Sequence, residues 1–203
     1  MLVRHCMSQN VVTIPPDAPL RDAWALLHRH AIRQLPVMRR ERLVGIVTDR
    51  DLRSAPQTAS SVAEVMTARP MVIPPETPLD EAARLLRRHR FGALPVVEDK
   101  QLVGILACAD VLDAFVELSG VAEASYHLVL TGTDGAESER NVRGVIAQKH
   151  GELKWVHRDK HRRPEQLHLR LRAKNIEDIV DELEAVGFEV SALVASKGRN
   201  ALV

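Results

Sequence analysis

The heptapeptide Gly45-Ile46-Val47-Thr48-Asp49-Arg50-Asp51 carries groups that can bind a sugar phosphate. β-Branched residues give way to charged ones within it, which predicts a strand that ends near Thr48 and a helix that begins just after it. Such a turn directs free backbone N–H groups at one point, which suits an anion. The Thr48 hydroxyl can donate to a phosphate oxygen, and the Asp51 carboxylate can accept from two vicinal ribose hydroxyls. Glycine at position 45 permits close approach of a ligand or of another backbone.

The chain repeats this heptapeptide and its surroundings. A shift of 59 residues, which takes Ile14 to Ile73, aligns the sequence with itself without a gap. Leu35-Pro36-Val37 then falls on Leu94-Pro95-Val96, and Asp51 falls on Asp110. A tandem repeat of this period indicates one supersecondary unit that is used twice.

Both copies predict the same order of elements. A short extended stretch, at 11–14 or 71–73, ends at two prolines. A helix with an apolar stripe follows, and it has Pro19 or Pro78 in its first turn. Two short strands and a closing helix complete the unit. Each unit alone buries little surface, so we expect the two copies to pack sheet to sheet with pseudo-twofold symmetry.

These motifs resemble a tandem of CBS domains, the Bateman module. The similarity lies in the "Leu-Pro-Val" strand and in Leu-Val-Gly-Ile-x-Thr-Asp-Arg-Asp-Leu, and it covers about residues 1–118. It implies CBS domains at 1–60 and 61–119, in an α+β fold with two βαββα repeats. It also implies a non-catalytic sensor that binds an adenine nucleotide (AMP, ADP or ATP) or S-adenosylmethionine in the cleft between the repeats.

The resemblance assigns roles to individual residues of the first copy. The Gly-x-x-Thr/Ser-x-x-Asp motif of the family maps onto Gly45, Thr48 and Asp51. Thr48 would contact phosphate or ribose, and Asp51 would bind the ribose hydroxyls. The adenine would be read near Val12, Thr13 and Ile14, and the phosphate would be met by Arg33 and Arg50.

The second copy departs from this pattern. It keeps Gly104 and Asp110, and Val72 and Ile73 correspond to the adenine-reading residues. It has Ala107 in place of the hydroxyl, and alanine cannot donate to a phosphate. We therefore expect the second cleft to bind a nucleotide more weakly, to bind a nucleoside without phosphates, or to stay empty. The missing charged-group hydrogen bond is worth about 1.5–3 kcal/mol.

The same residues also have a structural interpretation. Asp51 and Asp110 can simply cap the helices that follow them, and Thr48 can be no more than a β-former at the end of a strand. For the first copy the resemblance favours a ligand site over this interpretation. For the second copy both interpretations stay open.

The segment 125–203 has a different pattern, after a linker at 120–124. Its periodicities predict the order βαββαβ, a ferredoxin-like fold. The segment resembles an ACT domain, which implies a small effector such as an amino acid at the turn Gly132, Thr133, Asp134 and Gly135. A domain that only dimerises is the alternative, because this fold hosts many functions.

The order CBS–CBS–ACT resembles the acetoin-utilisation accessory proteins. This resemblance implies a regulatory part in carbon metabolism, a homodimer and a regulated protein partner of unknown identity. An interaction scaffold with vestigial clefts is the alternative. An enzyme on the C-terminal domain is the third hypothesis, although the sequence indicates no catalytic residue for it.

Composition excludes several other classes. A net charge of +1, evenly spread, offers no basic field for nucleic acid, and no apolar run is long enough to span a membrane. The N-terminus has no signal-peptide pattern, and two cysteines, Cys6 and Cys108, suit a reducing cytosol as free thiols. We expect Cys108, near the second cleft, to be a buried thiol. We therefore expect a cytoplasmic protein without a cofactor.

The histidines of the C-terminal segment predict no metal site, because their spacing forms no ligand quartet. The residues considered are His127, His150, His157, His161 and His168. We expect 157–163, a short basic run, to be a charged loop between two strands rather than a nucleic-acid patch.

Overall fold

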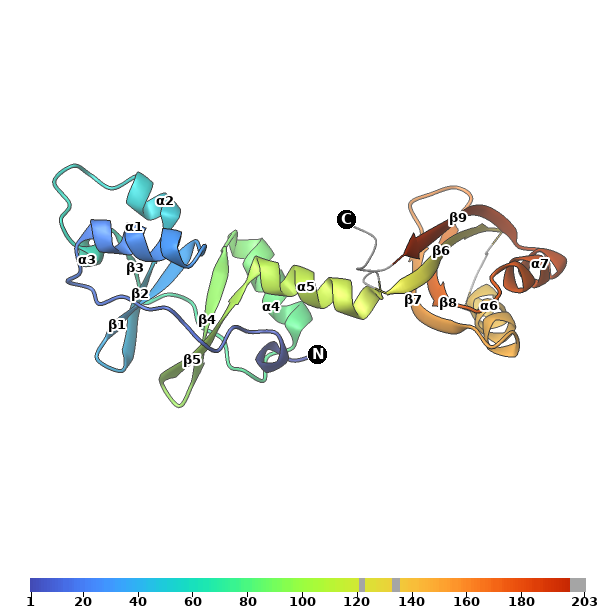
Figure 1. Cartoon of the computed structure of the whole chain (residues 1–203), viewed down its shortest axis with the longest axis horizontal. Coiled ribbons are helices and arrows are strands. Elements are labelled where there is room, and N and C mark those ends of the chain that lie inside the picture. The colour runs from blue at the N-terminus through green and yellow to red at the C-terminus, as the bar shows by residue number, and fades with distance from the viewer. Residues whose placement is uncertain (121–122, 133–135, 198–203) are drawn as a thin grey trace. The chain divides into compact units, whose positions relative to one another are not determined.

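The structure is a computed structural model that describes residues 1–120, 123–132 and 136–197. It consists of two compact units, Met1–Asp113 and Ala114–Val203. The elements of both are labelled in Figure 1. The division falls inside the helix α5, Cys108–Ser119. The linker proposed at 120–124 includes residues 121–122, which lie outside the described part of the chain, so it stays a prediction.

The first repeat has the predicted helix, hairpin and helix. Pro19 is the N-cap of the first helix rather than part of its first turn, and Ala23 and Leu27 form its buried face. The two strands are joined by a tight turn in which Arg40 has φ +55°. The elements are α1 (Leu20–Arg29), β1 (Gln34–Arg39), β2 (Arg42–Thr48) and α2 (Asp49–Arg53).

The second repeat reproduces this order, which confirms the prediction from the self-alignment. Its hairpin has the same antiparallel pairing, with Val96 opposite Gly104 where the first repeat has Val37 opposite Gly45. The elements are α4 (Leu79–His89), β4 (Ala93–Glu98), β5 (Gln101–Ala107) and α5, which ends before Gly120 at φ +67°. Strands β2 and β5 of the two repeats contact each other.

The segments that precede each repeat are exchanged between the repeats. The short helix η1 (Val3–His5) bonds to the second repeat through Val3 N–H and the Thr77 carbonyl, 2.9 Å apart. In return α3 (Val62–Val65) enters the core of the first repeat, and β3 (Thr67–Ala68) pairs with β2. We call residues 3–12 and 62–71 the leading segments. Each repeat therefore packs against the leading segment of the other, which extends the sheet and core of the first repeat and bridges to β5 of the second.

The predicted extended stretches are not strands. Each makes a single parallel bridge to its own repeat, Ile14 to Val37 and Ile73 to Val96. Ile14 and Ile73 are both nearly fully buried, with 2% and 3% of their surface exposed. The double prolines that follow these residues explain the early end, because proline has no N–H to continue a ladder.

The second unit contains the predicted βαββαβ order. Its antiparallel sheet has the strand order β7-β8-β6-β9. Its core includes Leu128 and Leu169 from the sheet, Ile146 from the first helix and Leu183 from the second. The elements are β6 (Ala124–Thr131), α6 (Ala136–Gln148), β7 (Glu152–Asp159), β8 (Gln166–Arg172), α7 (Glu177–Ala185) and β9 (Glu189–Lys197).

Three histidines of this unit lie on its sheet. His157 lies in β7, opposite His168 of β8, and β7 continues to Asp159, so the charged loop expected at 157–163 is shorter than predicted. His168 Nδ1 lies 3.4 Å from Nε2 of His127, and burial lowers the pKa of His127, with Arg170 and His168 contributing. Within the described part of the chain no three His, Cys, Asp or Glu residues are grouped to hold a metal ion.

No described helix is both long enough and apolar enough to cross a lipid bilayer.

Candidate functional site

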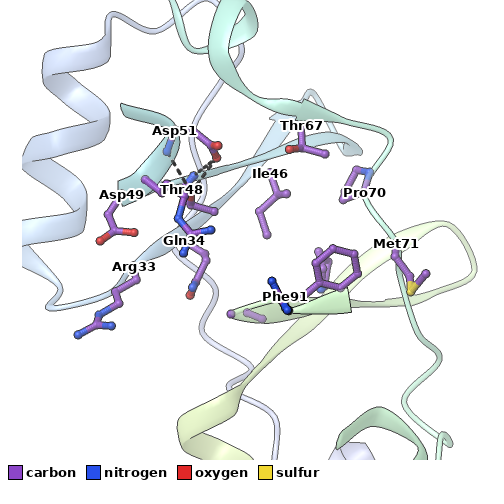
Figure 2. A pocket seen from close by; sticks show the side chains of 15 residues that line it. Arg33, Gln34, Ile46, Thr48, Asp49, Asp51, Thr67, Pro70, Met71 and Phe91 are labelled. Carbon is purple, nitrogen blue, oxygen red and sulfur yellow. Dashed lines mark hydrogen bonds between the residues drawn. The ribbon is translucent and has the colours of Figure 1, made fainter. Parts of the chain in front are cut away.

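Thr48 and Asp51 form a reciprocal capping box at the start of α2. The Asp51 N–H donates to Thr48 Oγ1 over 3.2 Å, and the Thr48 N–H donates to Asp51 Oδ2 over 2.8 Å. The Thr48 hydroxyl also donates to Asp51 Oδ2, at 2.8 Å. Both residues therefore cap the helix α2 in the folded chain, which is the structural role considered above as the alternative to ligand binding (Figure 2).

The capping box changes what each side chain can offer to a ligand. The Thr48 hydroxyl donates its hydrogen bond to Asp51, so it is not available as a donor to a phosphate. The hydrogen bonds described above use only Oδ2 of Asp51. Oδ1 is therefore the acceptor that remains for a ligand hydroxyl.

A cavity of about 420 Å³ adjoins this turn. We call it the first cavity. It joins the Thr48–Asp51 turn of the first repeat to the leading segment of the second, and Figure 2 shows Ile46 and Phe91 lying between Thr48 and Met71. The lining residues are Arg33, Gln34, Ile46, Thr48, Asp49, Arg50, Asp51, Thr67, Pro70, Met71, Arg90, Phe91, Gly92, Ala93 and Pro95.

The first cavity has a surplus of free positive charge. Arg33, Arg50 and Arg90 line it, all three are exposed, and none forms an ion pair among the described residues. Of its two carboxylates, Asp49 is paired with Arg53 at 2.5 Å and Asp51 belongs to the capping box. The cavity therefore suits an anionic ligand.

A second cavity, of about 680 Å³, surrounds the equivalent turn of the second repeat. The Ala107 N–H donates to Asp110 Oδ2 over 2.7 Å, so Asp110 also caps its helix. Burial raises the pKa of the Asp110 carboxyl; the Ala107 hydrogen bond opposes this, and Asp113 adds to it. The lining residues are Ser8, Asn10, Val11, Val12, Ala31, Ile32, Arg33, Gln34, Pro36, Gly92, Ile105, Ala107, Cys108, Ala109 and Asp110.

Cys6 and Cys108 form no disulfide bond, and Cys108 is not the buried thiol that the sequence suggested. Its side chain is exposed at the second cavity. Its Sγ donates to the Phe91 carbonyl over 3.4 Å.

The structure corrects the grouping of the predicted adenine-reading residues. Val12 lines the second cavity with Asp110, not the first with Asp51. Thr13 is exposed and lines neither cavity, while Ile14 belongs to the core of the first repeat. The exchange of the leading segments is the reason, since it carries each segment to the strand–helix turn of the other copy.

The residues predicted for the second site are corrected in the same way. Val72 is exposed, with 43% of its surface accessible, and it lines neither cavity. Ile73 is buried in the fold. Of this predicted set only Asp110 lines the second cavity.

The two motif glycines line neither cavity, which corrects their assignment to the ligand. A Cβ on Gly45 would collide with Met66 Sδ, and a Cβ on Gly104 would lie 2.5 Å from Met7 Sδ. The close approach expected at Gly45 is therefore made by a methionine of the leading segment of the other repeat.

Several lining residues of the first cavity were missed by the sequence reasoning. Met71, Phe91 and Arg90 come from the second repeat and meet Asp51 only in the folded chain. A signal existed, because Met71 is the counterpart of Val12 in the self-alignment. This signal would have indicated Met71 if the leading segment of the second repeat had been paired with the strand–helix turn of the first.

The effector turn predicted for the second unit falls mostly outside the described residues. Thr133, Asp134 and Gly135 belong to that part, whereas Gly132 is exposed with φ +77°. A cavity of about 600 Å³ in this unit is lined by other residues, among them Tyr126.

The comparison with protein families bears on the whole first unit. The model of the CBS domain family matches residues 3–57 and 62–117, which is more than half of the chain. The chain belongs to the CBS domain family. The two repeats are therefore a CBS pair, and its two cavities lie where each CBS repeat meets the leading segment of the other.

Curated relatives are similar to this chain over the CBS pair. An inosine-5'-monophosphate dehydrogenase of Korarchaeum cryptofilum is 36% identical over 104 residues, 51% of this chain and 22% of the relative. The chain thus spans about a fifth of that enzyme. The CBS domain-containing protein YhcV of Bacillus subtilis is 33% identical over 113 residues, 53% of this chain and 81% of YhcV.

Solved structures resemble the same region. CBSX2 in complex with AMP has a TM-score of 0.54 and 33% identity, covering 57% of this chain and 96% of that one. The CBS domain pair of protein MJ0100 with 5'-methylthioadenosine and S-adenosylmethionine has a TM-score of 0.54 and 28% identity, covering 57% and 99%. A putative acetoin utilization protein of Vibrio cholerae has a TM-score of 0.56 and 29% identity, covering 60% and 94%.

Proposed function

We propose that this CBS-pair protein is a non-catalytic regulator that binds an adenosine-type ligand, with the first cavity as its main site. One observation carries the proposal: this cavity combines the Asp51 carboxylate with three unpaired arginines and an apolar wall. The AMP complex of CBSX2 and the two adenosine compounds bound by the MJ0100 pair support the ligand class.

The side chains of the first cavity suit the parts of an adenine nucleotide. Oδ1 of Asp51 can accept from the ribose hydroxyls. Arg33, Arg50 and Arg90 can donate charge-assisted hydrogen bonds to phosphate oxygens. Apolar side chains such as Met71 can pack against the adenine ring. The preferred ligand is therefore a nucleotide such as AMP, ADP or ATP rather than a nucleoside.

Regulation requires that the ligand prefers one of two conformations of the protein. We infer that ligand binding to the CBS pair changes how the protein interacts with a protein partner of unknown identity. The assignment of the second unit as an ACT domain that binds an amino acid and joins two copies as a homodimer stays part of this proposal.

Calorimetric titration of the full chain with AMP, ADP, ATP and S-adenosylmethionine tests the proposed site. Asp51→Ala should weaken binding at least tenfold, since a charged hydrogen bond is worth about 1.5–3 kcal/mol. Asp110→Ala should matter less at the first cavity. Because Asp51→Ala also removes a helix cap, Asp51→Asn is the matched variant that retains an oxygen acceptor for the cap.

The competing function is an interaction scaffold with vestigial cavities. The capping box favours it, because Thr48 and Asp51 have a structural role without any ligand. Absence of binding by all four compounds to the wild-type chain would favour the scaffold. Binding that survives unchanged in both Asp51 variants would move the site away from the first cavity.

A further inference from the structure

Three residues line both cavities of the CBS pair: Arg33, Gln34 and Gly92. They form the wall between the cavities. The Gln34 amide lies directly over Gly92, because a Cβ added there would collide with Gln34 Nε2. Two ligands bound together would thus face each other across this wall.

Only the first repeat contributes a charged side chain to this wall. The counterpart of Arg33 in the self-alignment is Gly92, so the second repeat supplies no cation at this place. Arg33 is exposed and has no ion-pair partner among the described residues. Its guanidinium can therefore turn toward a ligand in either cavity.

The two cavities depend on Arg33 to different degrees. The first also has Arg50 and Arg90. Among the described residues that line the second cavity, Arg33 is the single cation, and Asp110 adds a carboxylate to the same lining. A phosphate in the second cavity that lost Arg33 would meet only negative charge.

We propose that Arg33 couples the two cavities, so that a phosphate-bearing ligand in the first disfavours a phosphate-bearing ligand in the second. A nucleoside with an uncharged 5' group needs no guanidinium and is not excluded. The second cavity is thus selective for such nucleosides whenever a nucleotide fills the first. This inference rests on the proposed function, because it assumes that both cavities accept adenosine-type ligands.

The size of the effect follows from the loss of one charge-assisted hydrogen bond, about tenfold to a hundredfold in affinity. The coupling is reciprocal, so a phosphate in the second cavity weakens the first by the same factor.

Titration calorimetry on the full chain tests the coupling with two probes, AMP and 5'-methylthioadenosine. The Asp51→Ala variant reports the second cavity alone, and Asp110→Ala reports the first alone. The second AMP should bind to the wild-type chain at least tenfold more weakly than AMP binds to Asp51→Ala. 5'-Methylthioadenosine should bind the second cavity equally well with and without AMP in the first. Asp51→Asn and Asp110→Asn replace the alanine variants if loss of a helix cap unfolds them.

Arg33→Ala should abolish the tenfold difference, and Arg33→Lys should retain part of it. Arg50→Ala is the matched control: it removes an arginine from the first cavity only, so it should weaken that site and preserve the coupling. An AMP isotherm of the wild-type chain equal to the sum of the two single-cavity isotherms would overturn this inference but leave the proposed function intact. Coupling that persists in Arg33→Ala would do the same. Failure of every adenosine compound to bind would overturn the proposed function as well.

Discussion

At the scale of single residues, Gly45 and Gly104 serve packing between the repeats. Each leaves room for a methionine of the leading segment of the other repeat, Met66 at Gly45 and Met7 at Gly104. The Thr67 carbonyl oxygen would also lie 3.2 Å from a Cβ on Gly45. A backbone atom yields less readily than a flexible thioether, so space at this position is limited from two sides.

Gly45→Ala should lower the free energy of unfolding of the CBS pair by about 1–3 kcal/mol, as overpacking does. Denaturant unfolding measures the change. Gly144→Ala is the control. Nothing lies within 4 Å of a Cβ added at this position of α6, so the free energy of unfolding of the second unit should rise by up to about 1 kcal/mol. A second change, Met66→Ala, should cost less in the Gly45→Ala background than in the wild type. Equal costs would contradict the packing role.

Asp110 gives a residue-scale prediction about pH. Burial raises its pKa in the folded protein above the ordinary value of 3.8, so the folded state binds this proton more tightly than the unfolded state. The associated stability is present below the unfolded pKa and is lost as the pH rises through the folded pKa.

Asp110→Asn removes this titration but keeps an oxygen that can accept from the Ala107 N–H. The melting temperature of the variant minus that of the wild type should therefore be higher at pH 7 than near pH 4. Thermal unfolding followed by circular dichroism at both pH values measures the difference. A relative melting temperature that is the same at both would show that burial of the carboxylate has no effect on folding.

At the scale of elements, the exchange of the leading segments decides which residues meet. β3 pairs with β2, and the single bridge from Ser8 joins the other leading segment to β5. Met71 and Val12 are therefore placed at the capping turns of the opposite repeats.

Substitutions in the leading segments test this crosswise pairing. Met71→Ala should weaken AMP binding to the first cavity by about tenfold, through loss of about 1.4 kcal/mol of apolar contact. It should leave 5'-methylthioadenosine binding to the second cavity unchanged, while Val12→Ala should have the reverse pattern. Calorimetry in the Asp110→Ala and Asp51→Ala backgrounds separates the two cavities. An effect of Val12→Ala on the first cavity would favour the pairing expected from the sequence.

At the scale of the whole molecule, the chain has two compact units with separate cores. The adenosine site proposed here lies in the first unit. A ligand that binds only the folded form of that unit stabilises it by mass action.

Scanning calorimetry should resolve the unfolding of the two units and show a ligand shift in only one. AMP at a hundredfold excess over its Kd should stabilise the CBS pair by about 2.7 kcal/mol. The transition of the second unit should not move. At the same AMP concentration Asp51→Ala should cut the stabilisation of the CBS pair to about 1.4 kcal/mol, as a tenfold weaker Kd requires. An equal shift of both transitions would indicate that the units unfold as one.

The sequence by itself determined the local structure of this protein and its duplication. Prolines 19 and 78 mark the start of α1 and α4, Gly120 marks the end of α5, and alternating apolar residues mark β8. These signals work because each depends on the chemistry of a residue and its near neighbours. They also placed Asp51 and Asp110 at equivalent strand–helix turns.

Only the tertiary structure decided the composition of the two cavities. Nothing local to Val12 states that it lies beside Asp110, or that Met71 lies beside Asp51. Those contacts arise because two repeats of related sequence each pack against the leading segment of the other, and a self-alignment is equally compatible with paired or crossed segments. The position of Arg33 was decided in the same way: it lines both cavities because the fold places it on their shared wall, together with Gln34 and Gly92.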